Sequence, residues 1–178
     1  MNIVILGQQG SGKTTQADLL AKKMGFHRLS AGDVSRDLMG QDTSEGHRAK
    51  EAMLAGELVH DDIIIPAFAK VLTRPEFATG VVIDGYPRNV YEATHSPFPI
   101  DKVIYLKVSR ETSVGRMVAR GRADDTPELI NAHLEVYHRE TEPVLDYYRQ
   151  LGVLTEVNGE PSEQEIFSEI LNKLRLTA

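Results

Sequence analysis

A glycine-rich stretch near the start of the chain, Gly7-Gln-Gln-Gly-Ser-Gly-Lys-Thr-Thr15, constrains the fold most strongly. Its spacing satisfies G-x-x-x-x-G-K-[ST], the pattern of a phosphate-binding loop, or P-loop. The apolar run 3–6 before it is typical of a buried strand, and apolar residues at helical spacing follow it up to Gly25. Backbone N–H groups of such a loop and the helix N-terminus both attract a polyphosphate. The stretch therefore predicts a strand, a loop and a helix that bind a nucleoside triphosphate.

Two side chains of the P-loop and one later carboxylate have predicted roles around the phosphates. Lys13 can reach the β- and γ-phosphates, and the Thr14 hydroxyl can face a bound magnesium ion. Asp84 ends another apolar run, which suits a carboxylate that faces magnesium directly or through water. The alternative for Asp84 is a turn or a helix cap. We expect Mg²⁺ as the cofactor, with ATP as the substrate that carries it.

Composition limits the class of protein. The chain has 178 residues, of which 41% are hydrophobic and 26% charged, and this suffices for one buried α/β core. A net charge of −6 argues against a nucleic-acid partner, and the lack of cysteine excludes disulfides and cysteine-held zinc. No apolar stretch approaches the ~20 residues that span a bilayer. We expect a cytoplasmic protein without a membrane partner.

Apolar runs alternate with helical patterns along the whole chain, which predicts a parallel sheet with helices on both faces. We treat residues 1–178 as a single domain, with a turn at Ser30–Asp33 and a small helical insert at about 30–60. A long helix is expected from Thr126 onward, with a kink at Pro143. The five predicted strands lie at residues 3–6, 26–29, 81–84, 103–106 and 153–157.

Arginines recur at the predicted ends of strands and helices and in the loop near residue 122. Guanidinium groups are rigid forked donors, and phosphoryl transfer needs cations around the oxygens of the transferred group. Each arginine taken alone could be a solvated surface charge, but several beside a P-loop favour phosphate binding. They are Arg36, Arg88, Arg116, Arg120 and Arg122.

The chain resembles the adenylate kinases, of the nucleoside monophosphate kinase family, over nearly its whole length. The resemblance implies a P-loop NTPase three-layer fold with a helical insert that binds the nucleoside monophosphate (NMP) and a short lid loop at about 121–127. It also implies transfer of a phosphoryl group from ATP to AMP, and a monomer. The matching stretches are Gly7–Gln16, Leu29–Asp33 with Arg36, Gly56–Val59, Asp84–Arg88, Arg116–Asp125 and Tyr137–Tyr148.

The same resemblance implies a role for individual positions. The implied ATP-binding residues are Gly10, Ser11, Gly12, Lys13, Thr14, Thr15, Arg116, Arg120 and Pro161. The implied NMP-binding residues are Ala31, Arg36, Glu57, Leu58, Val59, Gly85, Arg88, Glu92, Arg122 and His133. The implied catalytic residues are Lys13, Arg88, Arg120 and Arg122, and the implied metal residues are Asp84, through water, and Thr14.

Five positions depart from the adenylate kinase pattern, and one of them, Thr14 in place of the usual glycine, still fits the general P-loop pattern. Ala31 and Asn89 are similar to the residues of UMP/CMP kinases, whereas Glu92 replaces the glutamine that reads adenine. An ionised carboxylate only accepts hydrogen bonds, so it would face adenine N1 unfavourably. His133 replaces an arginine, and it is either a phosphate contact or a half-buried structural residue. These departures leave open a pyrimidine-preferring or broad NMP kinase and, from another class, a nucleotide-binding regulatory module without turnover.

Overall fold

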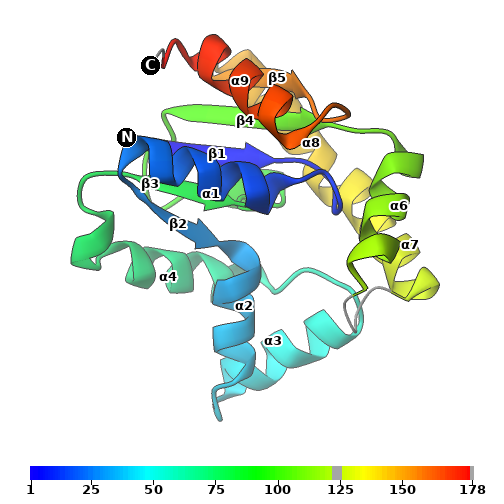
Figure 1. Ribbon diagram of the computed structural model, residues 1–178. Coiled ribbons are helices and arrows are strands. Elements are labelled where there is room, and N and C mark those ends of the chain that lie inside the picture. The colour runs from blue at the N-terminus through cyan, green and yellow to red at the C-terminus, as the bar shows by residue number, and fades with distance from the viewer. Residues whose placement is uncertain (122–125, 177–178) are drawn as a thin grey trace.

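Five short strands pair side by side in one parallel sheet, as the alternation of apolar and helical segments predicts. The computed structural model describes residues 1–121 and 126–176. The order of the strands across the sheet is β2-β3-β1-β4-β5, and all pairs are parallel (Figure 1). The strands are β1 (Asn2–Leu6), β2 (His27–Ser30), β3 (Val81–Asp84), β4 (Lys102–Lys107) and β5 (Leu154–Asn158).

Helices connect the strands, and several begin at a residue whose side chain caps the first turn. Thr43 and Thr126 each accept a backbone N–H group at the start of a helix, and Ser162 with Glu165 forms a capping box. The α-helices are α1 (Lys13–Met24), α2 (Ala31–Met39), α3 (Ser44–Leu54), α4 (Asp61–Leu72), α5 (Val90–Thr94), α6 (Arg110–Arg120), α7 (Pro127–Val136), α8 (Glu142–Gln150) and α9 (Glu163–Leu174). A 3₁₀ turn, η1 (Pro75–Phe77), and a π-helical turn, η2 (Tyr137–Thr141), complete the described elements.

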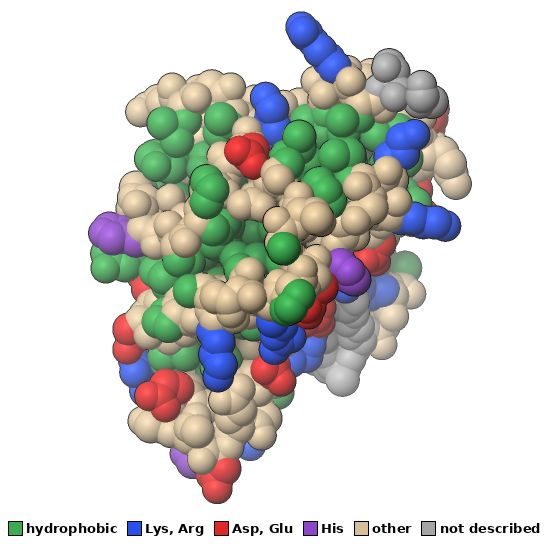
Figure 2. Space-filling view, turned by 90° about the vertical axis from the view of Figure 1, so that its left-hand side faces the viewer, with side chains coloured by type: hydrophobic (Ala, Val, Ile, Leu, Met, Phe, Trp, Pro, Cys, Tyr) green, Lys and Arg blue, Asp and Glu red, His purple; other side chains and the backbone are tan. Residues whose placement is uncertain are grey.

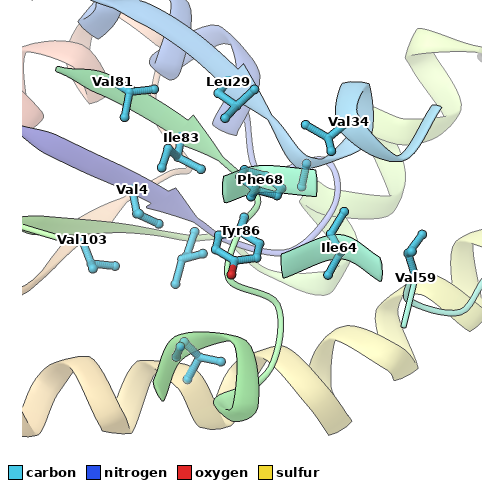
Figure 3. Close-up of a cluster of buried hydrophobic side chains, with 14 of the residues drawn as sticks. Val4, Leu29, Val34, Val59, Ile64, Phe68, Val81, Ile83, Tyr86 and Val103 are labelled. Atoms are coloured by element: carbon cyan, nitrogen blue, oxygen red, sulfur yellow. The ribbon is translucent and has the colours of Figure 1, made fainter. Parts of the chain in front are cut away.

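Two hydrophobic clusters cover the two faces of the sheet, because side chains of a strand alternate between its faces. On one face Ile3 and Ile5 of β1 pack with residues of α1 and α9. On the other face Val4 of β1 packs with residues of α4 and α8 (Figure 3). The expected three layers, helices–sheet–helices, are therefore confirmed.

Two local predictions need correction. The expected turn at Ser30–Asp33 is wrong, because α2 begins at Ala31 directly after β2, and Ser30 precedes it without a side-chain capping bond. The helix that begins after Thr126 is interrupted at η2, before Pro143, where the Glu142 N–H donates to the carbonyl of Tyr137, five residues back. Pro143 lies in the first turn of α8, where its missing N–H is tolerated.

The carboxyl ends of the strands all face the same side of the molecule. The loop after β1, the start of α2 and the helix α6 lie at this edge (Figure 1). Helices α2 and α3 project below the sheet (Figure 1). Figure 2 shows the face at the amino ends of the strands: charged side chains lie at its lower end, and hydrophobic side chains gather higher up. In the part of the chain that the structure describes, no helix is long and apolar enough to cross a membrane.

Candidate active site

The P-loop packs closely against the start of α6. Gly10 has a φ of +78°, and a Cβ atom at this position would collide with the backbone oxygen of Ser113. The hydroxyl of Ser113 donates to the Gln9 carbonyl, and the Gln8 amide donates to the carbonyl of Ser109 at 3.1 Å. These contacts fix the loop and leave room only for glycine at position 10. Ser11 lies within the same loop, and its buried hydroxyl has no hydrogen-bond partner among the described residues.

Lys13 opens α1, and its amine turns back over the P-loop. Its Nζ donates to the Gln8 carbonyl at 2.8 Å. Burial lowers the pKa of Lys13 to about 8; the carboxylate of Asp84 opposes this shift, and the charges of Arg88 and Arg120 add to it. The predicted catalytic lysine therefore shares one electrostatic environment with three other residues that the sequence singled out.

Thr14 and Asp84 meet across the top of the sheet. The Thr14 hydroxyl donates to Asp84 Oδ2 at 2.6 Å, and Asp84 is 5% exposed. Parallel pairing places Asp84, the last residue of β3, opposite Ile5 of β1, just before the P-loop. The two predicted metal residues thus lie side by side, and a carboxylate and a hydroxyl are the oxygen donors that magnesium prefers.

The turn after β3 brings Arg88 close to Lys13. Gly85 has a φ of +74°, and a Cβ atom there would lie 3.7 Å from the guanidinium of Arg88 and 3.9 Å from Cε of Lys13. Arg88 Nε donates to the Gly85 carbonyl at 2.8 Å, and burial lowers the pKa of Arg88, to which the charge of Arg36 contributes. The neighbouring Tyr86 stacks on Phe68 of α4 with ring centroids 4.1 Å apart and anchors the turn in the core (Figure 3).

Glu92 lies in the interior beneath this turn. It is 1% exposed, and its carboxylate accepts the backbone N–H of Arg88 at 2.6 Å. Burial raises the pKa of Glu92 to about 7; the Arg88 N–H and charge oppose the shift, and Asp61 adds to it. Glu92 therefore supports the backbone of Arg88 and is protonated in part near neutral pH.

Asn89 is occupied at both ends of its amide. Its oxygen accepts the Glu92 N–H at 2.7 Å, which caps α5, and its nitrogen donates to Asp61 Oδ1 at 2.7 Å. Asn89 thereby ties the turn after β3 to the start of α4. These two bonds explain the residue without a role in pyrimidine recognition.

The residues predicted for the NMP side line α2 and the loop before α4. Arg36 pairs with Asp33 at 2.5 Å, within α2. Ala31 and Val59 are buried, Leu58 is half-buried, and the exposed Glu57 pairs with Arg139 of η2 at 3.1 Å.

The residues predicted for the ATP side lie along α1 and α6. Thr15 lies half-buried in the first turn of α1. Arg116 donates to the carbonyls of Gly159 and Glu160 at 3.0 and 3.3 Å, so it lies beside the loop that contains Pro161. Arg122 and most of the predicted lid at 121–127 fall outside the described residues.

His133 of α7 is half-buried and lies near the end of α3. A Cβ atom at Gly56 would lie 3.8 Å from Cδ2 of His133 and 3.5 Å from Cβ of Ala132. The histidine therefore lies beside Gly56, near the end of the predicted insert. Both interpretations of His133, as a phosphate contact and as a structural residue, stay predictions.

Two residues of the site were missed by the sequence analysis. Arg28 of β2 lies 3.9 Å from Asp84. Because strand side chains alternate between the two faces of a sheet, the sequence could have placed Arg28 on the opposite face from Leu29. Thr141 of η2 donates its hydroxyl to the Arg88 carbonyl at 2.6 Å. No local pattern indicates that contact, because it joins residues 53 positions apart.

Comparisons with known proteins give one consistent result. A family model described as adenylate kinase matches residues 5–153. The adenylate kinase of Stenotrophomonas maltophilia strain K279a is 40% identical over an alignment of 186 positions, which covers 98% of this chain and 100% of that protein. That of Nocardia farcinica strain IFM 10152 is 40% identical over 92% and 94% of the two chains, and that of Brucella ovis is 37% identical over 96% of each. The similarity extends far beyond the P-loop.

Proposed function

Because the chain belongs to the adenylate kinase family, we propose that it transfers the terminal phosphoryl group of ATP to AMP and releases two molecules of ADP. The observation that carries the proposal is that Lys13 and Arg88 both lie beside Gly85: a Cβ atom built there would lie 3.9 Å from Cε of Lys13 and 3.7 Å from the guanidinium of Arg88. One cation belongs to the P-loop and the other to the turn after β3. A phosphoryl group between a donor on the P-loop and an acceptor beside α2 would contact both.

The reaction needs little covalent chemistry from the protein. An oxygen of the AMP phosphate attacks the γ-phosphorus of ATP, the bond to the β–γ bridging oxygen breaks, and its electron pair stays on ADP. Lys13, Arg88 and Arg120 stabilise the negative charge of the transferred group, since fixed cations need no reorganisation during the step. Arg36 gives up its ion pair with Asp33 and then holds the AMP phosphate. Arg122 adds a further cation from the lid.

The side chains at the top of β3 fit a magnesium ion. Asp84 and Thr14 offer two oxygen atoms 2.6 Å apart, and the carboxylate is 5% exposed. When bound, magnesium neutralises and orients the β- and γ-phosphates of ATP. Thr14 would hold the ion through its hydroxyl and Asp84 would hold it through water, because Mg²⁺ keeps several of its water ligands.

The other predicted residues complete the two nucleotide sites. Residues 30–60 form the NMP-binding insert of a single domain at 1–178, and residues 121–127 form the lid. Both close over the substrates, because water in an open site would accept the phosphoryl group. Gly10, Ser11, Gly12, Thr15, Arg116 and Pro161 hold ATP, and Ala31, Glu57, Leu58, Val59, Gly85 and His133 line the AMP side, where the buried Glu92 supports Arg88 from beneath.

The test is the initial rate of ADP formation from ATP and Mg²⁺ with AMP, CMP, UMP, GMP and dCMP offered separately. We expect AMP to give the highest kcat/KM. A preference for CMP or UMP would refute the proposed substrate. ATP binding without turnover of any of the five would place the protein in the regulatory class. A cytoplasmic location and a monomeric state are also proposed, and light scattering of the purified chain tests the second.

A further inference from the structure

Arg28 joins three carboxylates that belong to different elements. Its Nε donates to Asp18 of α1 at 2.6 Å, and its NH1 lies 3.3 Å from Asp33 of α2 and 3.9 Å from Asp84 of β3. Arg28 itself is on β2, at the edge of the sheet, with a side chain that is 24% exposed. One guanidinium therefore lies within ion-pair distance of acids from three neighbouring segments.

Two of these acids also bind residues of the proposed phosphate sites. Asp84 accepts the Thr14 hydroxyl at 2.6 Å through Oδ2, the oxygen that faces Arg28. Asp33 is also shared, but through both oxygens: Oδ2 faces Arg28, and Oδ1 accepts from Arg36 at 2.5 Å. Asp84 thus links Arg28 to the magnesium side, and Asp33 links it to Arg36 on the AMP phosphate side.

We propose that Arg28 is a positioning residue that sets the charge available at both sites, by weakening the attraction of Asp84 for magnesium and the attraction of Asp33 for Arg36. The proposal rests on the proposed function, since it assigns Asp84 to the metal and Arg36 to the AMP phosphate.

The effect on the metal follows from Coulomb's law. A fixed positive charge 3.9 Å from the Asp84 carboxylate repels a divalent cation that approaches the same carboxylate. The carboxylate is 5% exposed, so solvent screens this repulsion only in part. Loss of the Arg28 charge should therefore strengthen the dependence of nucleotide binding on magnesium.

The effect on AMP has the opposite sign. While Asp33 is divided between two guanidinium groups, its hold on Arg36 is weaker than that of an undivided carboxylate. Without Arg28, Asp33 pairs with Arg36 alone and competes more strongly with the AMP phosphate. Loss of the Arg28 charge should therefore weaken AMP binding.

The experiment measures binding by calorimetry with the full chain and without turnover. The first readout is the ratio of the Kd of AMP-PNP, a non-hydrolysable ATP analogue, in EDTA to its Kd in saturating Mg²⁺. We expect Arg28→Gln to raise this ratio about three- to tenfold and to weaken AMP binding about two- to fivefold. Arg28→Lys keeps the charge and should return the ratio to within about twofold of the original chain. Arg149→Gln removes an exposed arginine paired with Glu156 and should change neither readout.

A stronger magnesium dependence of AMP-PNP binding together with weaker AMP binding separates a positioning role from a purely structural one. If Arg28 only fastens β2 to α1 through Asp18, Arg28→Gln lowers the melting temperature and leaves the ratio unchanged, which overturns the proposal. A fall in the ratio, or tighter AMP binding, overturns it as well. If the original chain binds AMP-PNP equally well with Mg²⁺ and with EDTA, the proposed magnesium site fails. A normal magnesium dependence that Arg28→Gln does not alter refutes the role of Arg28 alone.

Discussion

At the scale of single residues, the site is built from ionisable groups withdrawn from water. Burial disfavours the charged form of each group, so it lowers the pKa of Lys13 to about 8 and raises that of Glu92 to about 7. Perturbed values of this kind are frequent where a protein binds charged ligands. Both groups therefore change their charge within the range in which enzyme assays are run.

Lys13 should take up protons when a nucleotide binds near pH 8. A phosphate beside the amine favours its charged form, so binding raises the pKa of Lys13 above about 8. Affinity for AMP-PNP should fall as the pH rises from 7 to 9, by at most about tenfold per pH unit above that value. Calorimetry at pH 8 in buffers of different ionisation enthalpy measures the uptake. Lys13→Met should abolish it and Lys70→Met, on the exposed side of α4, should retain it; equal uptake in both variants would contradict the assignment.

Glu92 should make the protein less stable as the pH rises. Its pKa is about 7 in the folded chain and 4.5 in the unfolded reference, so the folded state binds more protons between these values. The free energy of unfolding contributed by this group therefore falls as the pH rises from about 4.5 to 7 and stays low above. Glu92→Gln removes the buried charge and should raise the free energy of unfolding by about 1–3 kcal/mol at pH 8, with a much smaller gain at pH 5.

Urea unfolding at the two pH values measures this difference, with Glu76→Gln on the exposed turn η1 as the control. An equal effect of Glu92→Gln at pH 5 and pH 8 would show that the carboxyl group does not titrate differently on folding.

At the scale of elements, the π-helical turn η2 connects the helix layer to the turn after β3. Its last residue, Thr141, is 6% exposed and donates to the carbonyl of Arg88 at 2.6 Å. Glu92 accepts the backbone N–H of Arg88, so both backbone polar groups of Arg88 are bonded to side chains. π-helical turns are frequent at functional sites. Here η2 directs the Thr141 hydroxyl toward Arg88, which lies 53 positions earlier in the sequence.

Thr141→Val should loosen Arg88 without changing the volume of the core. The variant leaves a buried carbonyl unpaired, which costs about 1–3 kcal/mol of the free energy of unfolding. A less well-held Arg88 should raise the KM for AMP several-fold and leave the KM for ATP nearly unchanged, because the Thr141 hydroxyl bonds to Arg88, which the proposed function places on the AMP side. Steady-state kinetics and thermal unfolding measure the two effects.

Thr94→Val is the matched control, since the Thr94 hydroxyl is exposed and its partners are local: the carbonyls of Val90 at 2.9 Å and Tyr91 at 3.1 Å, and Nδ1 of the adjacent His95 at 3.0 Å. Equal changes in both KM values for Thr141→Val would argue against a specific effect on Arg88.

Local rules explain which of these elements could be predicted. The P-loop and the helix start at Thr126 depend on residues within a few positions of one another, and the sequence predicts them correctly. Arg28 and Thr141 act across strands and helices that only the tertiary fold brings together. Pro143 indicates a missing backbone donor, but the sequence does not tell whether the helix bends there or widens one turn earlier.

At the scale of the whole molecule, the C-terminal segment completes the layer that carries the P-loop helix. Ile166 and Ile170 of α9 pack in the same cluster as Ala17 and Leu20 of α1. The amide of Gln16 in α1 also donates to the carbonyl of Glu163 at 3.0 Å. The position of the P-loop helix therefore depends on residues beyond 153, where the match to the family model ends.

Ile170→Ala should destabilise the whole fold and not the C-terminus alone. Ile170 is fully buried, and its truncation removes apolar contacts and leaves a cavity against α1, which costs about 2–5 kcal/mol. Leu151→Ala is the control, because that side chain is 55% exposed and should cost less than about 0.5 kcal/mol. Urea unfolding followed by circular dichroism measures both values.

A single unfolding transition, shifted by AMP-PNP and Mg²⁺ in both variants, is expected because a ligand of the folded state stabilises all elements that unfold with its site. Loss of α9 in a separate early transition that leaves AMP-PNP binding intact would show that the P-loop helix holds its position without the C-terminal layer.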